Sequence, residues 1–233
     1  MKPAGVAGVV AIAALVAGAI QTPRFERTQQ ELFAAGGSFV NAWADYDSDG
    51  DLDLFVGFDG APNRLYRNDR GQFADAAATA GVADARPTRA VAWGDADNDG
   101  DPDLLVGFTP GPDPAGPNPS DSSRATSVLR FYRNANGAFA DDTDAAGLQV
   151  AVGAVRQPVW VDFDGDLDMD LFVAFRDKPN AMFRNDGGRF VDVAASVGLA
   201  DPRRTVGAVW FDHDEDGDLD LVTGNMDGDA NGL

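Results

Sequence analysis

The sequence contains no cysteine, which excludes disulfide bonds, thiolate zinc sites and cysteine nucleophiles. It has a single histidine, His213, and we recognise no glycine-rich phosphate loop and no nucleophile–base pair in it. Basic residues are also few, since 18 Lys and Arg stand against 38 Asp and Glu and the net charge is −20. Nucleic acid is not an expected partner, because phosphate backbones are bound by clustered basic residues.

The acidic surplus is concentrated in four nine-residue loops that carry aspartate at positions 1, 3, 5, 7 and 9. The loops span residues 45–53, 95–103, 162–170 and 212–220. Their aspartates are Asp45, Asp47, Asp49, Asp51, Asp53, Asp95, Asp97, Asp99, Asp101, Asp103, Asp162, Asp164, Asp166, Asp168, Asp170, Asp212, Asp214, Asp216, Asp218 and Asp220. Without these 20 residues the acidic side chains number 18 and balance the 18 basic ones, so the loops account for the whole net charge.

Alternating aspartates at this density indicate a calcium site. Calcium takes six to eight oxygen ligands, whereas carboxylates crowded without a cation repel one another. We expect positions 1, 3 and 5 to turn carboxylates inward, position 7 to offer its main-chain carbonyl, and position 9 to close the site with a carboxylate. The sequence therefore predicts about four Ca²⁺ ions, one for each loop.

The third loop departs from the pattern at position 6. Gly50, Gly100 and Gly217 occupy this position in the other loops and suit a sharp turn with positive φ. The third loop has Leu167 there and Gly165 at position 4. Holding a leucine in the left-handed region costs about 1–2 kcal/mol, so we expect the site at 162–170 to be the weakest.

An EF-hand is the main alternative calcium loop, and the sequence argues against it. An EF-hand needs a bidentate glutamate at position 12, where this chain has Val56, Val106, Val173 and Thr223. The flanking segments also have the apolar pattern of strands rather than helices. His213 stands at position 2 of the fourth loop, where we expect its side chain to point to solvent rather than to act as a base.

Four tryptophans mark an internal repeat. Trp43, Trp93, Trp160 and Trp210 each precede their loop by two residues, at spacings of 50, 67 and 50. The long interval contains an insertion at 109–127 with five prolines, which we interpret as a surface loop. Each period of about 50 residues contains four short strand patterns, and the third includes an Arg-Asn pair. The predicted fold is all-β, with four-stranded blades arranged as a β-propeller or as an open, partial propeller array.

The boundaries follow from this period. Residues 1–19 have the pattern of a signal peptide, cleaved or retained as an anchor. The repeat region covers 24–233, with a partial repeat at 24–37 that resembles a last strand, repeats from about 38, 88 and 155, and a partial repeat at 205–233. The final repeat stops as its third strand begins. These numbers leave open a strained four-blade ring, a fragment of a longer protein, and an open array that pairs end to end with other copies.

The run Trp-x-Asp-x-Asp-x-Asp-Gly-Asp-x-Asp-Leu, followed by Leu-Tyr-Arg-Asn and Gly-x-Phe, resembles the FG-GAP/VCBS repeats of integrin-like β-propellers. The chain is similar to bacterial secreted proteins and the cartilage acidic protein group that carry such repeats. This resemblance implies calcium in the turn between the first two strands of each blade, and a secreted or cell-surface location.

The expected function is that of a secreted, non-enzymatic calcium-binding module with a structural, adhesive or protein-interaction role. Its expected partners are calcium, other extracellular proteins, glycans or copies of itself, and no transmembrane segment is expected in the mature chain. One alternative is a subunit that assembles into an extracellular filament or ladder through incomplete terminal blades. Another is a carbohydrate-binding or enzymatic propeller, for which the sequence offers no catalytic set.

Overall fold

The computed structural model describes residues 27–109, 128–226, 228 and 230–232. The expected signal peptide, the start of the first partial repeat at 24–26, and residues 110–127 of the insertion lie outside the described residues. Within the described part of the chain, no helix is long and apolar enough to cross a membrane.

Three antiparallel four-stranded sheets follow one another along the chain, and a two-stranded sheet comes last. We call each sheet a blade. The first blade contains β1 (Ser38–Ala44), β2 (Asp53–Phe58), β3 (Arg64–Asp69) and β4 (Gln72–Asp75), and the second contains β5 (Thr88–Gly94), β6 (Asp103–Phe108), β7 (Leu129–Ala135) and β8 (Ala138–Asp141). The third contains β9 (Val155–Val161), β10 (Asp170–Phe175), β11 (Ala181–Asn185) and β12 (Phe190–Asp192), and the fourth contains β13 (Thr205–Phe211) and β14 (Asp220–Asn225). Two short helices, α1 (Ala77–Ala80) and α2 (Ala194–Val197), follow the first and third blades, so the all-β prediction is confirmed.

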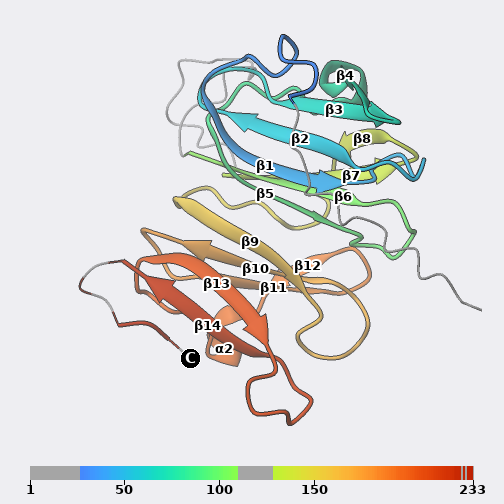
Figure 1. The fold of residues 1–233 in the computed structure, drawn as a ribbon. Coiled ribbons are helices and arrows are strands. Elements are labelled where there is room, and N and C mark those ends of the chain that lie inside the picture. Colours follow the sequence, from blue (N-terminus) through green and yellow to red (C-terminus); the bar gives the residue numbers. More distant parts are fainter. Residues whose placement is uncertain (1–26, 110–127, 227, 229, 233) are drawn as a thin grey trace, which may run out of the picture.

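The blades form an open array rather than a ring (Figure 1). The first strands of successive blades lie against one another, β1 against β5, β5 against β9 and β9 against β13. All strand pairing within residues 27–109 and 128–232 stays inside single blades, and the first and fourth blades lie at opposite ends (Figure 1). The described residues therefore do not close into the four-blade ring that the repeat number would allow.

The tryptophans join successive blades. Trp93 on β5 contacts Phe55 of the preceding blade and Phe139 of its own blade, with ring centroids 6.4 and 5.9 Å apart. The other pairs across blades are Trp160 with Phe131 and Trp210 with Phe172. Trp43 belongs to the first blade, has no preceding blade beside it and is 51% exposed. Trp93, Trp160 and Trp210 are therefore partly buried between neighbouring blades, whereas Trp43 is exposed.

Close approach between blades depends on small residues. A Cβ atom at Gly94 would lie 2.6 Å from the ring of Trp160 in the next blade. A Cβ atom at Gly107 would lie 2.6 Å from Cγ1 of Val155. Side chains at these two positions would separate the sheets, because a buried Cβ cannot occupy space so near another heavy atom.

The N-terminal segment does not form the expected strand within its described residues. Residues 29–33 form a turn, and Phe33 packs on Tyr66 and Phe73 with centroids 4.8 and 5.5 Å apart. The Gln29 side chain accepts a hydrogen bond from the Phe73 N–H (2.7 Å) and donates one to the Phe73 carbonyl (2.9 Å). A strand needs a neighbouring strand to pair with, and no strand of the described residues pairs with this segment. The segment instead covers the outer strand of the first blade.

The C-terminal residues begin a third strand in the fourth blade. Thr223 on β14 forms an antiparallel bridge with Gly232. The same register joins Val56 to Arg64 in the first blade. The Asn231 side chain accepts the Asn225 N–H at 3.1 Å, matching the hydrogen bond from Phe58 to Asn63. The fourth blade thus follows the same hydrogen-bonding plan as the complete ones.

Candidate metal site

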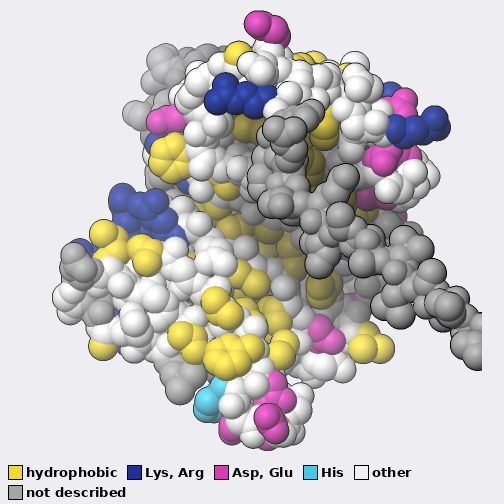
Figure 2. All heavy atoms as spheres, viewed as in Figure 1, with side chains coloured by type: hydrophobic (Ala, Val, Ile, Leu, Met, Phe, Trp, Pro, Cys, Tyr) yellow, Lys and Arg dark blue, Asp and Glu magenta, His cyan; other side chains and the backbone are white. Residues whose placement is uncertain are grey.

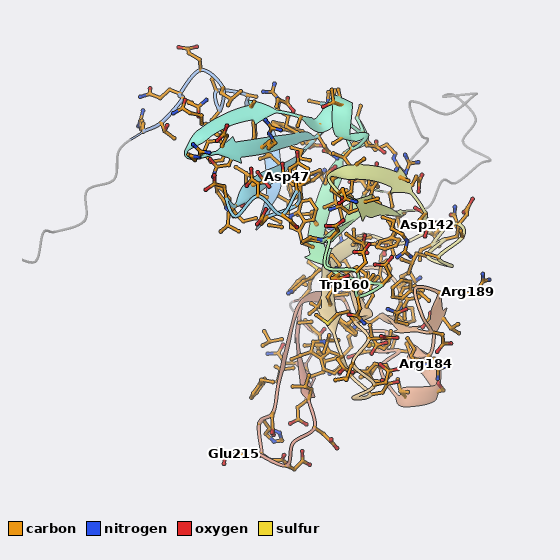
Figure 3. The ribbon with its side chains drawn as sticks, turned by 90° about the vertical axis from the view of Figure 1, so that its right-hand side faces the viewer. Asp47, Asp142, Trp160, Arg184, Arg189 and Glu215 are labelled. Carbon is orange, nitrogen blue, oxygen red and sulfur yellow. The ribbon has the colours of Figure 1, made fainter. Side chains whose placement is uncertain are left out.

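The four aspartate loops connect the first and second strands of each blade and lie along one side of the array (Figure 1). Acidic side chains and the single histidine gather at the tip of the loop between β13 and β14 (Figure 2). Figure 3 labels Asp47 in the first loop and Glu215 at the tip of the fourth, with Trp160 between the second and third blades. This common placement follows from the equivalent position of each loop within its blade.

The position 1 aspartate organises the backbone of each regular loop. In the first loop, Asp45 accepts the N–H groups of Asp49 (3.0 Å) and Gly50 (2.9 Å), and Asp49 accepts the N–H of Asp51 (2.9 Å). The second and fourth loops repeat these three hydrogen bonds. The chain therefore curls around its first carboxylate, as a backbone that wraps an ion must.

Carboxylates converge in all four loops. In each loop three aspartates offer oxygen atoms within 4.8 Å of one another, namely Asp45, Asp47 and Asp53; Asp95, Asp97 and Asp99; Asp162, Asp164 and Asp170; and Asp212, Asp214 and Asp216. Asp47 Oδ1 is buried and has no hydrogen-bond partner within the described part of the chain. Burial, and then the negative charge of Asp49, raises the pKa of Asp47. An all-oxygen donor set with an unsatisfied buried oxygen fits a hard cation such as Ca²⁺.

The position 9 aspartates also anchor the blades. Asp53 is fully buried and accepts the N–H of Tyr46 at the loop start (3.1 Å) and the N–H of Asn68 on β3 (2.7 Å). Burial raises the pKa of Asp53 to about 6, against the opposing effect of these two hydrogen bonds. Asp103 and Asp170 repeat the arrangement with pKa values of about 6. Position 9 therefore ties the loop to the second and third strands, a role that sequence reasoning missed.

The position 7 side chains face the hairpin between the third and fourth strands. Asp51 accepts the N–H of Arg70 and Asp101 accepts the N–H of Asn136, both at 2.7 Å. These carboxylates are held by the hairpin, which is consistent with a position 7 that serves the ion through its main-chain carbonyl. In the third loop, the Asp168 carboxylate instead accepts the side-chain amide of Asn98 at 2.8 Å, which links neighbouring loops.

Backbone strain is distributed more evenly than the sequence suggested. Leu167 does adopt the left-handed region, with φ of +75° and a side chain that is 81% exposed. Position 4 is left-handed as well, and there the third loop has Gly165 (φ +76°). The other loops place Ser48, Asn98 and Glu215 at position 4 with φ between +56° and +62°. Each loop thus contains one strained non-glycine residue, and the third loop exchanges the two positions.

The asparagines of the second and third Arg-Asn pairs join their blade to the loop of the preceding blade. Asn134 donates to the carbonyl of Tyr46 in the first loop (2.8 Å) and accepts the N–H of Gly137 (2.9 Å). Asn185 donates to the Ala96 carbonyl of the second loop at 2.7 Å in the same way. These asparagines therefore have a structural role that extends across the blade interface.

The arginine of one pair reaches a candidate ligand. Arg133 Nη1 lies 2.5 Å from Asp97 Oδ2, and its Nε lies 3.0 Å from a carboxylate oxygen of Asp142. The contact fixes one oxygen of the position 3 aspartate and leaves the other for a cation. Hydrogen bonds of this kind orient the ligands of metal sites.

His213 is exposed, as expected, and its side chain also contacts its own loop. Its Nδ1 lies 2.6 Å from Asp220 Oδ2, and this hydrogen bond and the charge of Asp220 raise the pKa of His213. At the same loop position, Tyr46 and Ala96 are buried and belong to clusters that include residues of the following blade. Position 2 therefore faces the next blade, and His213 lies on the exposed end of the array.

Comparison with known proteins agrees with the repeat pattern. The model of the FG-GAP-like repeat matches residues 24–106 and 162–223. Mouse cartilage acidic protein 1 is 34% identical over 114 residues, which is 48% of this chain and 16% of that protein. Human cartilage acidic protein 1 is 43% identical over 61 residues, or 25% of this chain and 9% of that protein. The chain thus spans only a small part of the length of these relatives.

Proposed function

The chain belongs to the FG-GAP-like repeat family, and from that premise we propose that it is an extracellular calcium-binding module with an interaction or structural role rather than a catalytic one. The observation that carries the calcium proposal is the repeated convergence of three carboxylates in every loop. The unsatisfied buried oxygen of Asp47 supports it, because a bound cation would satisfy that atom.

Calcium would act as a cross-link within each complete blade. The ion would be held by carboxylates at positions 1, 3, 5 and 9 and by the main-chain carbonyl at position 7. Positions 7 and 9 also contact the third strand or its hairpin, so a single ion would stabilise three strands together. Four such ions, with eight positive charges, would change the formal charge from −20 to −12. In a chain without cysteine, metal ions would supply cross-links that disulfides provide elsewhere.

The interaction role is supported by family membership and by the surfaces at the two ends of the array. The relatives are cartilage acidic proteins, and this name fits an extracellular setting. At the first blade, Phe39 and Trp43 are exposed. At the fourth blade, Val209, Phe211 and Leu219 are exposed. Large exposed apolar side chains of this kind favour contacts with other protein surfaces.

Thermal unfolding with and without calcium tests this proposal. At a free calcium concentration 100 times the dissociation constant, each site contributes about 2.7 kcal/mol, so chelation with EGTA should lower the melting temperature by well over 5 °C. Magnesium at the same concentration is the matched control and should restore little, because it demands a tighter octahedral site. A melting temperature that EGTA leaves unchanged would contradict the calcium proposal.

A second candidate role is end-to-end assembly of copies of this chain. Trp43 is 51% exposed at the place where Trp93, Trp160 and Trp210 contact a preceding blade. The fourth blade of another copy would cover it in the manner of a preceding blade. Sedimentation velocity in calcium should show concentration-dependent oligomers that Trp43→Ser abolishes. A wild-type protein that remains monomeric at all concentrations would exclude this role.

A further inference from the structure

An arginine-lined cavity lies at the strand ends opposite the calcium loops. It has a volume of about 470 Å³ and is lined by residues of three successive blades. Arg89 comes from the start of β5, Arg156 from the start of β9, and Arg176 directly follows β10. Phe39 of β1 and Thr109 also line the cavity. Dark-blue side chains gather beside the start of β9 and the end of β10 (Figure 2).

The cavity contains hydrogen-bond donors without acceptors. Arg89 Nη1, Arg156 Nε and Thr109 Oγ1 are buried and have no hydrogen-bond partner among the residues that the structure describes. A buried donor left unsatisfied costs about 1–3 kcal/mol, and more when the group is charged. Three such atoms on three different segments of one cavity are therefore a costly arrangement unless an acceptor occupies the space between them.

The guanidinium of Arg89 is also held in place. Arg89 Nη2 lies 3.2 Å from Asp59 Oδ1, and its guanidinium carbon lies 4.1 Å from the centroid of the Phe39 ring. These contacts fix the direction of the guanidinium while its Nη1 remains unsatisfied. A donor that is already oriented loses little entropy when it binds a ligand.

Positive charge is crowded in the cavity. Burial, and then the charges of Arg176 and Arg89, lowers the pKa of Arg156. Asp177 is the one acidic residue that lines the described cavity, and its Oδ1 already accepts the N–H of Ala154 at 2.6 Å. Three arginines therefore face one aspartate inside the cavity, although the chain as a whole carries a net charge of −20.

We propose that this cavity binds an oxyanion group, a sulfate or a carboxylate, carried by an extracellular partner. Guanidinium groups form paired, charge-assisted hydrogen bonds with such anions. The exposed Phe39 ring provides an apolar wall for the part of the partner that carries the anion. The biological source of the anion rests on the interaction role proposed above, whereas anion binding itself does not depend on calcium.

The inference is tested by titrating the calcium-loaded full chain with sodium sulfate and, separately, with sodium acetate at constant ionic strength. Binding is followed by calorimetry and by the Arg Nε–Hε signals in NMR spectra. Arg156→Gln and Arg176→Gln remove charge from the cavity. Arg70→Gln is the matched control, because its side chain is 91% exposed on the β3–β4 hairpin.

We expect saturable binding of at least one anion by the wild-type protein and by Arg70→Gln, and at least tenfold weaker binding by both cavity variants. Circular dichroism and melting curves identify a variant that has lost its fold. If Arg156→Gln does not fold, Arg176→Gln provides the test, because Arg176 is exposed and its substitution should leave the fold intact. Failure of the wild type to bind either anion, or an unchanged affinity in folded Arg156→Gln and Arg176→Gln, would overturn the inference. Sulfate binding by a protein whose melt ignores EGTA would refute the calcium proposal and leave this site standing.

Discussion

Replacement of Leu167 by glycine should stabilise the protein, although it removes a large side chain. Leu167 has φ of +75°, and its side chain is 81% exposed, so little apolar surface is lost with it. Its N–H donates to Asp162 at 3.1 Å, a hydrogen bond that glycine preserves. The substitution therefore changes mainly the backbone strain at this position.

The magnitude follows from two opposing effects. Relief of a left-handed leucine contributes about 1–2 kcal/mol. The greater freedom of glycine in the unfolded chain offsets about 0.4–1 kcal/mol of this gain. The net stabilisation is about 1 kcal/mol, which corresponds to a rise in melting temperature of about 2–4 °C for a chain of this size.

Urea unfolding in excess calcium, followed by tryptophan fluorescence and far-UV circular dichroism, measures the effect. Gly50→Leu is the mirror variant in the first loop, where φ is +93° and no atom lies within 4 Å of the added Cβ. With Ser48 already left-handed, this variant would hold two strained residues and should lose about 1–2 kcal/mol. If Leu167→Gly destabilises the protein, or if Gly50→Leu has no effect, the account of strain in these loops is wrong.

Two further predictions concern the blade interface and a buried ion pair. Gly94→Ala should lower the free energy of unfolding in urea by about 1–3 kcal/mol, because the added Cβ would lie 2.6 Å from the Trp160 ring. Gly36→Ala is the control and should be nearly neutral, because no atom lies within 4 Å of its added Cβ. Equal effects of the two substitutions would contradict the close packing of the blades. The Asp84 and Arg86 side chains are 7% and 4% exposed and lie 2.8 Å apart, so Asp84→Asn should remove about 3 kcal/mol at pH 7. Burial raises the pKa of Asp84, but the hydrogen bonds and charge of Arg86 outweigh burial and lower this pKa below 3.8. The difference in unfolding free energy between wild type and Asp84→Asn should therefore persist above pH 3.8 and vanish as the pH falls through the folded-state pKa of Asp84. A difference that stays constant down to pH 2 would contradict this assignment.

The fold was predictable because its signals are local. Each signal lies within one loop and its flanking residues. These signals are the aspartates that curl the chain, the tryptophan two residues before the loop, and the apolar strand that follows it. Repetition of these signals made the blade period evident despite the insertion at 109–127. The convergence of the aspartates at positions 1 and 3 of every loop was predictable for the same reason, since their spacing is part of the loop itself.

Features that depend on contacts between blades were not predictable. The anchoring role of Asp53 requires Asn68 on another strand, 15 residues away. Arg89 and Arg156 meet in one cavity only because β5 and β9 are neighbours, and no fixed spacing marks them. The environment of His213 likewise follows from its position on the end face of the array.

Calcium stoichiometry is the most direct test of the central claim, that four loops of one design each hold an ion. Native mass spectrometry of protein first stripped of metal and then loaded with calcium should show four bound ions. Asp95→Asn removes the position 1 carboxylate of the second loop and should reduce this number to three, with the fold retained. A wild-type protein that binds no calcium, or a count that the variant leaves unchanged, would contradict the account.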